Sequence, residues 1–302
     1  MNKGYLLVFL TSIISGFSIF INKFGVSIVN PYIFTWLKNL IVSFLLIGVI
    51  LALKDWRKLK NLTQKQWFLL VLIGLIGGSI PFLLFFKGLS LTSAVKGSFI
   101  HKTMFIYVAV LATFFLKEKI DRKFLFGGVL LLIGNLILLK KLPIEINKGD
   151  LLVFLATLLW AIENTISKYA LKNLEGRIVA WARMFFGVIF IFLFLLPSGQ
   201  LHLIFNLNLK QIFWVLITAI ILFGYVMTWY SGLKLIPVSQ ATVILLFGSP
   251  ITTFLNLISG GKISQTEILS TILIILGLVF VLGLKKVLEI IKSLKNLIYV
   301  RT

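Results

Sequence analysis

Ten apolar runs, each long enough for one helical crossing of a lipid bilayer, follow one another along this chain. A crossing needs roughly 20 predominantly apolar residues, and only short polar connections separate the runs. Apolar residues make up 59% and charged residues 13% of the 302 positions, against about 45–50% and about 25% in soluble domains. We therefore predict an all-α integral membrane protein with ten transmembrane helices, at residues 5–21, 31–53, 67–86, 95–116, 124–139, 151–167, 178–196, 212–233, 238–259 and 268–284.

The remaining composition excludes several classes of function. The chain has no cysteine and only two histidines, His101 and His202, which lie far apart, so we expect no metal site and no cofactor. The net charge of +21 does not indicate nucleic-acid binding, because the basic residues fall mostly in the short connections between apolar runs. No H-E-x-x-H motif and no paired aspartates occur in the apolar runs, so we do not expect an enzyme.

The second half of the chain repeats the first at an offset of 145 residues. The segment GYLLVFL begins at Gly4, and GDLLVFL begins at Gly149. With one residue deleted, Gly88 matches Gly232. The same 145-residue offset relates Lys23 to Lys168, Trp36 to Trp181, Lys38 to Arg183 and Gln66 to Gln211. We predict a first five-helix repeat at 1–145, a second at 146–284 and a separate tail at 285–302.

Five helices per repeat require the two joined repeats to cross the membrane in opposite directions. The basic residues test this inversion, since cytoplasmic connections carry an excess of Lys and Arg. With the N-terminus in the cytoplasm, 19 of the 30 basic residues fall in inner segments and 8 in outer connections. We therefore predict two inverted repeats in the cell membrane, with both termini cytoplasmic.

The tail KKVLEIIKSLKNLIYVRT begins at Lys285 and mixes apolar and basic positions. Its apolar residues Val287, Ile291, Leu294 and Ile298 recur at helical spacing, with lysines between them. This pattern predicts a basic amphipathic helix on the inner leaflet. A simple basic flank that anchors the last span is the alternative.

Four segments carry recognisable local motifs: LLWAIENTISKYAL (158–171), its weaker counterpart ISGFSIFINKFG (14–25), PYIFTWLKNL (31–40) and LKEKID (116–121). Together with the repeat, they resemble the drug/metabolite transporter superfamily, specifically its EamA-like members. Three positions depart from the pattern, because Ser15 replaces a tryptophan, Lys38 an arginine and Lys262 a glutamate. The resemblance implies a carrier of small solutes with a central cavity. It leaves the substrate open, because the superfamily spans many solutes.

Four charged residues, Lys38, Lys102, Glu163 and Arg183, lie inside the apolar runs. A charge at the bilayer centre costs about 2.5–3.5 kcal/mol on insertion scales, so each needs a partner or water. At about 1.5 Å of helical rise per residue, Glu163 and Arg183 lie at a similar depth on consecutive helices. We predict an ion pair between them. The alternative is that Glu163 takes and releases protons as a coupling group.

Lys38 has no acidic residue at its depth in the first repeat. The ionisable residues nearest to it in depth are His101 and Lys102, which are not acidic. These three residues therefore form a basic cluster without a counter-charge. We predict that Lys38, with Lys102 and His101, contacts an anionic group of the substrate. The alternatives are that the lysines reach the interface or helix-end carbonyls, and that His101 makes a structural hydrogen bond.

Aromatic residues are candidates for a cavity wall. Trp160 and Trp229 lie deepest in their runs, although core packing or an interfacial position also accounts for any single one of them. Lys23 and Lys168 lie at helix ends, where they are most simply terminal anchors.

We predict a secondary transporter that moves a small metabolite, an amino acid or another solute with an anionic group, by alternating access. The expected partners are this small-molecule substrate and the lipid bilayer, while a coupling proton and a homodimer stay open. One alternative is a flippase or channel for lipids or small molecules, which a lipid-facing groove lined by Lys38 and Lys102 would favour. Another is a proton-coupled exporter of neutral or cationic drugs.

Overall fold

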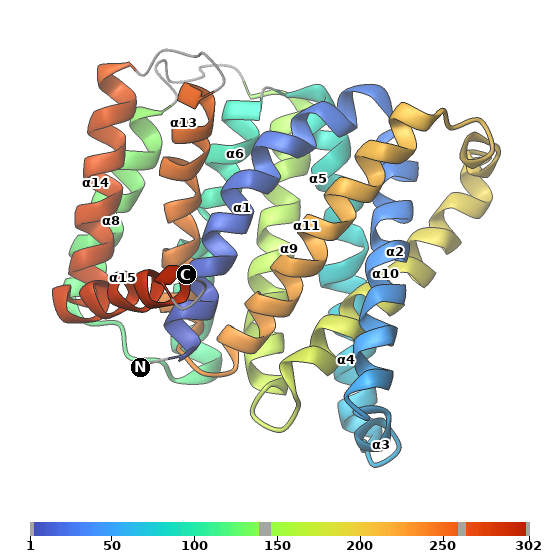
Figure 1. The fold of residues 1–302 in the computed structure, drawn as a ribbon, viewed down its shortest axis with the longest axis horizontal. Helices are drawn as coiled ribbons and strands as arrows, with labels where there is room; N and C mark the ends of the chain where they lie inside the picture. Colours follow the sequence, from blue (N-terminus) through green and yellow to red (C-terminus); the bar gives the residue numbers. More distant parts are fainter. Residues whose placement is uncertain (1–2, 93, 139–145, 259–263, 300–302) are drawn as a thin grey trace.

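The computed structural model describes residues 3–92, 94–138, 146–258 and 264–299, and every regular element in these ranges is helical (Figure 1). Three of the eight basic residues counted in the outer connections, Lys140, Lys141 and Lys262, lie outside the described residues. The elements are α1 (Lys3–Ile28), α2 (Pro31–Ala52), α3 (Trp56–Leu59), α4 (Gln64–Gly78), α5 (Ile80–Leu91), α6 (Ala94–Lys102), α7 (Met104–Leu111), the π-helix η1 (Ala112–Leu116), α8 (Arg122–Ile137), α9 (Lys148–Ala170), α10 (Gly176–Ser198), the 3₁₀ helix η2 (Leu201–Ile204), α11 (Leu209–Leu233), α12 (Val238–Ile244), the 3₁₀ helix η3 (Leu245–Phe247), α13 (Gly248–Ile258), α14 (Gln265–Leu282) and α15 (Leu284–Tyr299).

Eight helical segments in the described part of the chain are long and apolar enough to cross a membrane. They are Pro31–Ala52, Gln64–Leu91, Lys96–Leu116, Lys148–Ala170, Gly176–Ser198, Leu209–Leu233, Val238–Leu255 and Gln265–Leu282. The other two predicted runs correspond to α1, whose apolar part Lys3–Ser18 is shorter, and to the 16-residue α8. The protein is an all-helical, multi-pass membrane protein, so the predicted helical class is confirmed.

Polar residues just ahead of the apolar runs begin the helices. The Asn30 side chain accepts hydrogen bonds from the backbone N–H groups of Tyr32 and Ile33, next to Pro31, which has no N–H to satisfy. Four further helices begin with a capping box, in which two side chains bond each other's backbone. These pairs are Thr63–Gln66, Asn147–Asp150, Asn208–Gln211 and Ser264–Glu267. Local cap chemistry therefore sets these helix starts.

One of the spans is interrupted near its middle at Ser79, where α4 gives way to α5. The backbone of Ser79 leaves the helical region, with φ −129° and ψ −77°, two residues before Pro81. Pro81 has no N–H, so the carbonyl of Gly77 loses its helical partner. Trp160 of α9 supplies the replacement, because its Nε1 donates to the Gly77 carbonyl at 3.0 Å. The break therefore joins α4 to the other half of the chain.

Helices of the two halves pack in reciprocal pairs. α1 packs on α11, and α5 packs on α9. Glycines make both contacts close, because a Cβ added to Gly232 would lie 3.1 Å from the carbonyl oxygen of Gly4, and one added to Gly149 would lie 2.7 Å from that of Gly88. α10 packs on both α2 and α4, and α8 pairs with α14 at one side of the bundle. Figure 1 shows α15 running across the bundle near the start of α1.

Candidate substrate-binding cavity

A cavity of about 580 Å³ lies inside the bundle, lined by residues of α1, α2, α5, α6, α7, α9, α10 and α11. Five of the seven predicted site residues line it, namely Lys38, His101, Trp160, Arg183 and Trp229. The rest of the lining is mostly aromatic, hydroxyl-bearing or amide-bearing, and the described lining residues include no acidic side chain. The volume is in the range of small-molecule sites.

Lys38 enters this cavity from α2 and is only 2% exposed. Its Nζ lies 4.2 Å from the ring centre of Phe86, 4.9 Å from that of Phe34 and 3.4 Å from Oδ1 of Asn22. Within the described part of the chain, no carboxylate lies within 4.0 Å of it. With the Phe82 ring centre at 5.8 Å, three cation–π contacts and one long hydrogen bond surround this ammonium, whose three hydrogens leave donors to spare.

The predicted ion pair between Glu163 and Arg183 is wrong as a direct contact, since no ion pair within 4.0 Å joins these two described residues. Glu163 Oε1 instead accepts hydrogen bonds from the hydroxyls of Tyr230 at 2.6 Å and Ser167 at 2.5 Å. The guanidinium of Arg183 lies 5.8 Å from the ring centre of Tyr230 and 5.4 Å from that of Phe82. Tyr230 therefore contacts both charged groups and takes the place of the direct pair.

Gly77 gives both charged side chains room against the backbone of α4. A Cβ on Gly77 would lie 2.3 Å from Cγ of Glu163 and 3.4 Å from Nε of Arg183. Glu163 is fully buried and does not line the cavity, whereas Arg183 does. A ligand in the cavity can therefore contact the Arg183 side chain but not the Glu163 carboxylate.

Aromatic rings form much of the wall around the cations. Trp160 meets Phe82 edge-on, with ring centres 5.4 Å apart, and meets His101 edge-on at 5.1 Å. Trp229 is fixed by a hydrogen bond from its Nε1 to Oδ1 of Asn164 at 3.0 Å. These contacts hold the rings in place, so the cavity offers a ligand preformed apolar surfaces beside its two cations.

Lys102 and Glu163 do not line the cavity, although their sequence neighbours His101 and Asn164 do. Lys102 is 8% exposed, and no described residue offers it a carboxylate within 4.0 Å. Successive residues of a helix point about 100° apart, so the neighbour of a lining residue need not face the cavity. The predicted cluster of Lys38, His101 and Lys102 is therefore brought together only in part.

Sequence reasoning missed the small polar residues that complete the lining. Ser15, Ser18 and Asn22 of α1 lie on one side of the cavity, and Asn164 of α9 on another. The first three are spaced by three and four residues, which places them on one helix face. Such a polar stripe inside an apolar run is the signal that could have found them. Asn22 Nδ2 donates to Oγ of Ser18 at 2.8 Å, which turns Oδ1 toward Lys38.

The cavity reaches the surface at the end of the bundle where α1 ends, because its lining there includes the exposed residues Ser27 and Ser90. At the opposite end, Nζ of Lys168 donates to the carbonyl oxygens of Leu233 and Ile236, each at 2.7 Å. Lys168 therefore ties the end of α9 to the turn that follows α11. Lys168 was expected to be a simple anchor at a helix end, and the structure instead shows it bonded to the backbone of another helix and its turn.

Glu118, from the LKEKID segment, closes the same end from the first half of the chain. Its carboxylate accepts hydrogen bonds from the backbone N–H groups of Val238 at 2.8 Å and Ser239 at 3.1 Å, and from the Ser239 hydroxyl at 2.6 Å. Val238 and Ser239 are the first residues of α12, so the carboxylate caps the N-terminus of a helix in the other half.

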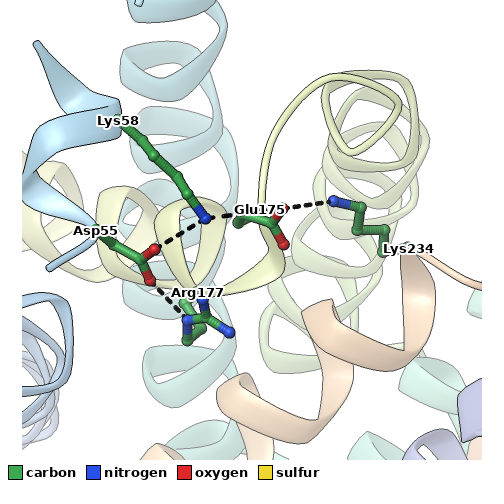
Figure 2. A network of polar contacts seen from close by, with 5 residues as sticks. All are labelled: Asp55, Lys58, Glu175, Arg177 and Lys234. Carbon is green, nitrogen blue, oxygen red and sulfur yellow. Dashed lines mark hydrogen bonds and ion pairs between the residues drawn. The ribbon is translucent and has the colours of Figure 1, made fainter. Parts of the chain in front are cut away.

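A network of five charged side chains joins the connections at this closed end (Figure 2). Asp55 is 1% exposed, accepts a hydrogen bond from Nε of Arg177 at 2.7 Å and pairs with Lys58 at 3.0 Å. Glu175 lies 3.9 Å from Nζ of Lys58 and 3.1 Å from that of Lys234. The hydrogen bond from Arg177 lowers the pKa of the Asp55 carboxyl below its ordinary value, because it favours the charged form.

A cavity with buried cations, inside a bundle of membrane-crossing helices, defines a class of membrane proteins that take a small solute into their interior. The model of the EamA-like transporter family matches residues 2–140 and again residues 147–283. The chain therefore belongs to the EamA-like transporter family, and the resemblance found in the sequence is confirmed.

Individual relatives agree with this assignment. The chain is 25% identical over 298 residues to the uncharacterized transporter YyaM of Bacillus subtilis, covering 94% of each chain. It is 26% identical over 304 residues to the riboflavin transporter ImpX of Fusobacterium nucleatum, covering 92% of this chain and 96% of that one. A solved crystal structure that is 16% identical shares the fold, with a TM-score of 0.74 over 93% of this chain and 98% of its own. The protein is a membrane transporter of small molecules.

Proposed function

We propose that this protein is a secondary transporter that moves a small metabolite with an anionic group across the cell membrane by alternating access. The observation that carries the proposal is that Lys38 and Arg183 both line the cavity, and no described lining residue is acidic. Cations inside a membrane protein are costly and mark substrate pathways, and Lys38 has no carboxylate within 4.0 Å among the described residues. An anionic group on the substrate supplies the missing counter-charge through charge-assisted hydrogen bonds.

The proposed motion is a rocking of two inverted five-helix repeats, 1–145 and 146–284, with ten transmembrane helices and both termini in the cytoplasm. The two separate matches of the family model support this division, as do the reciprocal α1–α11 and α5–α9 contacts. The cavity is open where α1 ends, whereas Lys168 and Glu118 tie the other end. On the proposed topology, this conformation is open to the outside.

Two observations favour this proposal over its alternatives. A lipid flippase would present Lys38 and Lys102 in a groove that faces lipid, yet both side chains are buried, at 2% and 8% exposed. A proton-coupled exporter of cationic drugs would need an accessible carboxylate, yet Glu163 is fully buried and is bonded by Tyr230 and Ser167. We therefore assign Glu163 a structural role.

Solute counterflow into vesicles that contain the purified protein tests the proposal. The solutes are matched pairs that differ in an anionic group, such as amino acids with their amides, and riboflavin, suggested by the name of one relative, with its 5′-phosphate. We expect exchange of the anionic members. Lys38→Met lowers that exchange about tenfold or more, which corresponds to about 1.4 kcal/mol. Lys210→Met, an exposed lysine outside the cavity, serves as the matched control.

Two results would contradict the proposal. One is exchange of the neutral members at an equal rate and without any effect of Lys38→Met, which would make Lys38 structural. The other is movement of labelled phospholipid between leaflets with no exchange of any water-soluble solute, which would favour the flippase.

A further inference from the structure

A second, smaller cavity of about 240 Å³ lies where the start of α1 meets α15. Tyr5 of α1 forms one side, and Lys285, Lys286 and Glu289 from the first turns of α15 form the other. This α15 cavity shares no lining residue with the central cavity. The proposed transport cycle makes no use of its charged groups.

Lys286 has a hydroxyl, and not a carboxylate, as its partner. Its Nζ donates to the Tyr5 hydroxyl at 3.0 Å and lies 4.8 Å from the centre of that ring. The Tyr5 hydroxyl in turn donates to Oε1 of Gln240 on α12. In the described ranges no acidic oxygen lies within 4.0 Å of Lys286. The protein therefore does not neutralise this cation.

The position that matches Tyr5 in the second half of the chain holds an acidic residue. The repeat aligns Tyr5 with Asp150, and Asp150 forms an ion pair of 2.7 Å with Lys96. The repeat does not align Lys96 with Lys286, so only the acceptor position is shared between the two halves. Tyr5 carries no carboxylate, so an external anion can supply the negative charge beside Lys286.

Glu289 adds a negative charge to the same cavity. It follows Lys285 and Lys286 by four and three residues, which is the spacing of helical ion pairs. However, no described residue forms an ion pair with Glu289 within 4.0 Å. The cavity therefore presents two cations and a separate anion, and this pattern complements a zwitterion better than a simple anion.

α15 exposes an apolar helix face close to this cavity. α15 runs across the bundle, and its residues Leu284, Leu288 and Ile291 are 59%, 55% and 44% exposed (Figure 1). Their spacing of four and three residues puts them on one helix face, while Ile290 and Ser293 are buried. An apolar helix face beside basic residues is typical of helices that lie at the membrane interface.

We propose that the α15 cavity binds the headgroup of an aminophospholipid. The phosphate lies against Lys285 and Lys286, and the primary ammonium donates to Glu289, so both charges of the headgroup are paired. Basic pockets at the cytoplasmic side of membrane helices are known to hold phospholipid headgroups. Because Tyr5 links Lys286 to Gln240, a bound lipid holds α15 against both α1 and α12.

Native mass spectrometry of the purified full-length protein in detergent tests this site. Phosphatidylethanolamine, phosphatidylglycerol and phosphatidylcholine with equal acyl chains are compared, and inorganic phosphate is added as a competitor. We expect phosphatidylethanolamine to bind about tenfold or more tightly than phosphatidylcholine. Lys286→Gln is expected to weaken the binding of both phosphatidylethanolamine and phosphatidylglycerol. Glu289→Gln is expected to remove the preference for phosphatidylethanolamine over phosphatidylglycerol. Lys292→Gln, exposed on the same helix but outside the cavity, leaves binding unchanged.

Three outcomes would overturn the proposal. Equal binding of phosphatidylethanolamine and phosphatidylglycerol by the wild type would show that Glu289 does not contact the headgroup ammonium. An equal loss in Lys286→Gln and Lys292→Gln reduces the site to diffuse surface charge. Displacement of lipid by inorganic phosphate at millimolar concentration identifies a free-phosphate site. If Lys286→Gln does not fold, Lys285→Gln, at an exposed position, gives the same readout.

Discussion

The hydroxyl of Tyr230 on α11 donates a hydrogen bond of 2.6 Å to Oε1 of Glu163 on α9. Ser167 donates to the same oxygen at 2.5 Å, while the buried Oε2 has no hydrogen-bond partner among the described residues. This carboxylate is fully buried next to the cavity arginine, Arg183. Tyr230 therefore holds the buried acid in position and lies beside Arg183, the cation that lines the cavity.

Replacing Tyr230 with phenylalanine is expected to destabilise the protein by about 1.5–3 kcal/mol, the worth of a hydrogen bond to a charged group. The thermal unfolding temperature in detergent, followed by tryptophan fluorescence, measures the loss. Tyr107→Phe is the control, because the Tyr107 ring packs on Phe154 and its hydroxyl makes no hydrogen bond with described residues. Equal unfolding temperatures for the two variants would show that the bond to Glu163 adds nothing.

Alanine at Gly77 is expected to cost about 1–3 kcal/mol, the usual range for overpacking. The new Cβ lies 2.3 Å from Cγ of Glu163 and 2.8 Å from its Cδ, so the carboxylate has to move. Gly48→Ala is the matched control, since no heavy atom lies within 4 Å of a Cβ there. Alanine at Gly48 is neutral or stabilises by up to about 1 kcal/mol through helix propensity. The prediction fails if both variants unfold at the wild-type temperature.

Methionine at Lys102 is expected to keep transport and to leave stability unchanged or raised. Lys102 is buried outside the cavity lining without a carboxylate partner among described residues, so its charge is a cost that methionine removes. Lys38→Met, inside the cavity, is expected to lose exchange of anionic solutes at unchanged stability. Counterflow and thermal unfolding are measured on both variants. An equal loss of exchange in Lys38→Met and Lys102→Met would show that Lys102 also takes part in substrate binding.

The sequence was sufficient to predict an all-helical protein that crosses the membrane several times, and insufficient to predict which side chains meet. Apolar runs and capping residues such as Asn30 and Asn147 locate helix starts, because these signals are local. Depth along a helix also follows from counting residues, and it brought Glu163 and Arg183 to the same level. The direction of a side chain around the helix axis depends on which neighbours pack there. Counting residues therefore could not reveal that Tyr230 is the partner of Glu163.

The donor that completes the interrupted span at Ser79 was unpredictable for a related reason. Pro81 signals that the Gly77 carbonyl loses its partner, and this loss can be read from the sequence. The replacement donor, Trp160, is 83 residues away and reaches the carbonyl only in the assembled bundle. Likewise, the stripe of Ser15, Ser18 and Asn22 is visible in the sequence, but its orientation toward Lys38 follows from the packing of α1.

The network around Asp55 predicts how stability responds to acid. Arg177 lowers the pKa of the Asp55 carboxyl below its ordinary value of 3.8. A carboxyl with a lowered pKa stabilises the folded state above the unfolded pKa, and this contribution is lost as the pH falls through the folded pKa. Asp55→Asn is therefore expected to destabilise the protein by about 1–3 kcal/mol at pH 7, because Arg177 and Lys58 lose their partner.

The difference between wild type and Asp55→Asn is expected to shrink only as the pH falls below the ordinary carboxyl pKa of 3.8, where the unfolded chain takes up a proton that the folded Asp55 carboxylate does not. Thermal unfolding of both proteins between about pH 3 and pH 7 measures this difference. Lys65→Gln, at an exposed position in the first turn of α4 and outside the network, controls for general effects of charge. A difference that stays constant across the whole range would mean that the Asp55 carboxylate charge does not stabilise this end of the bundle.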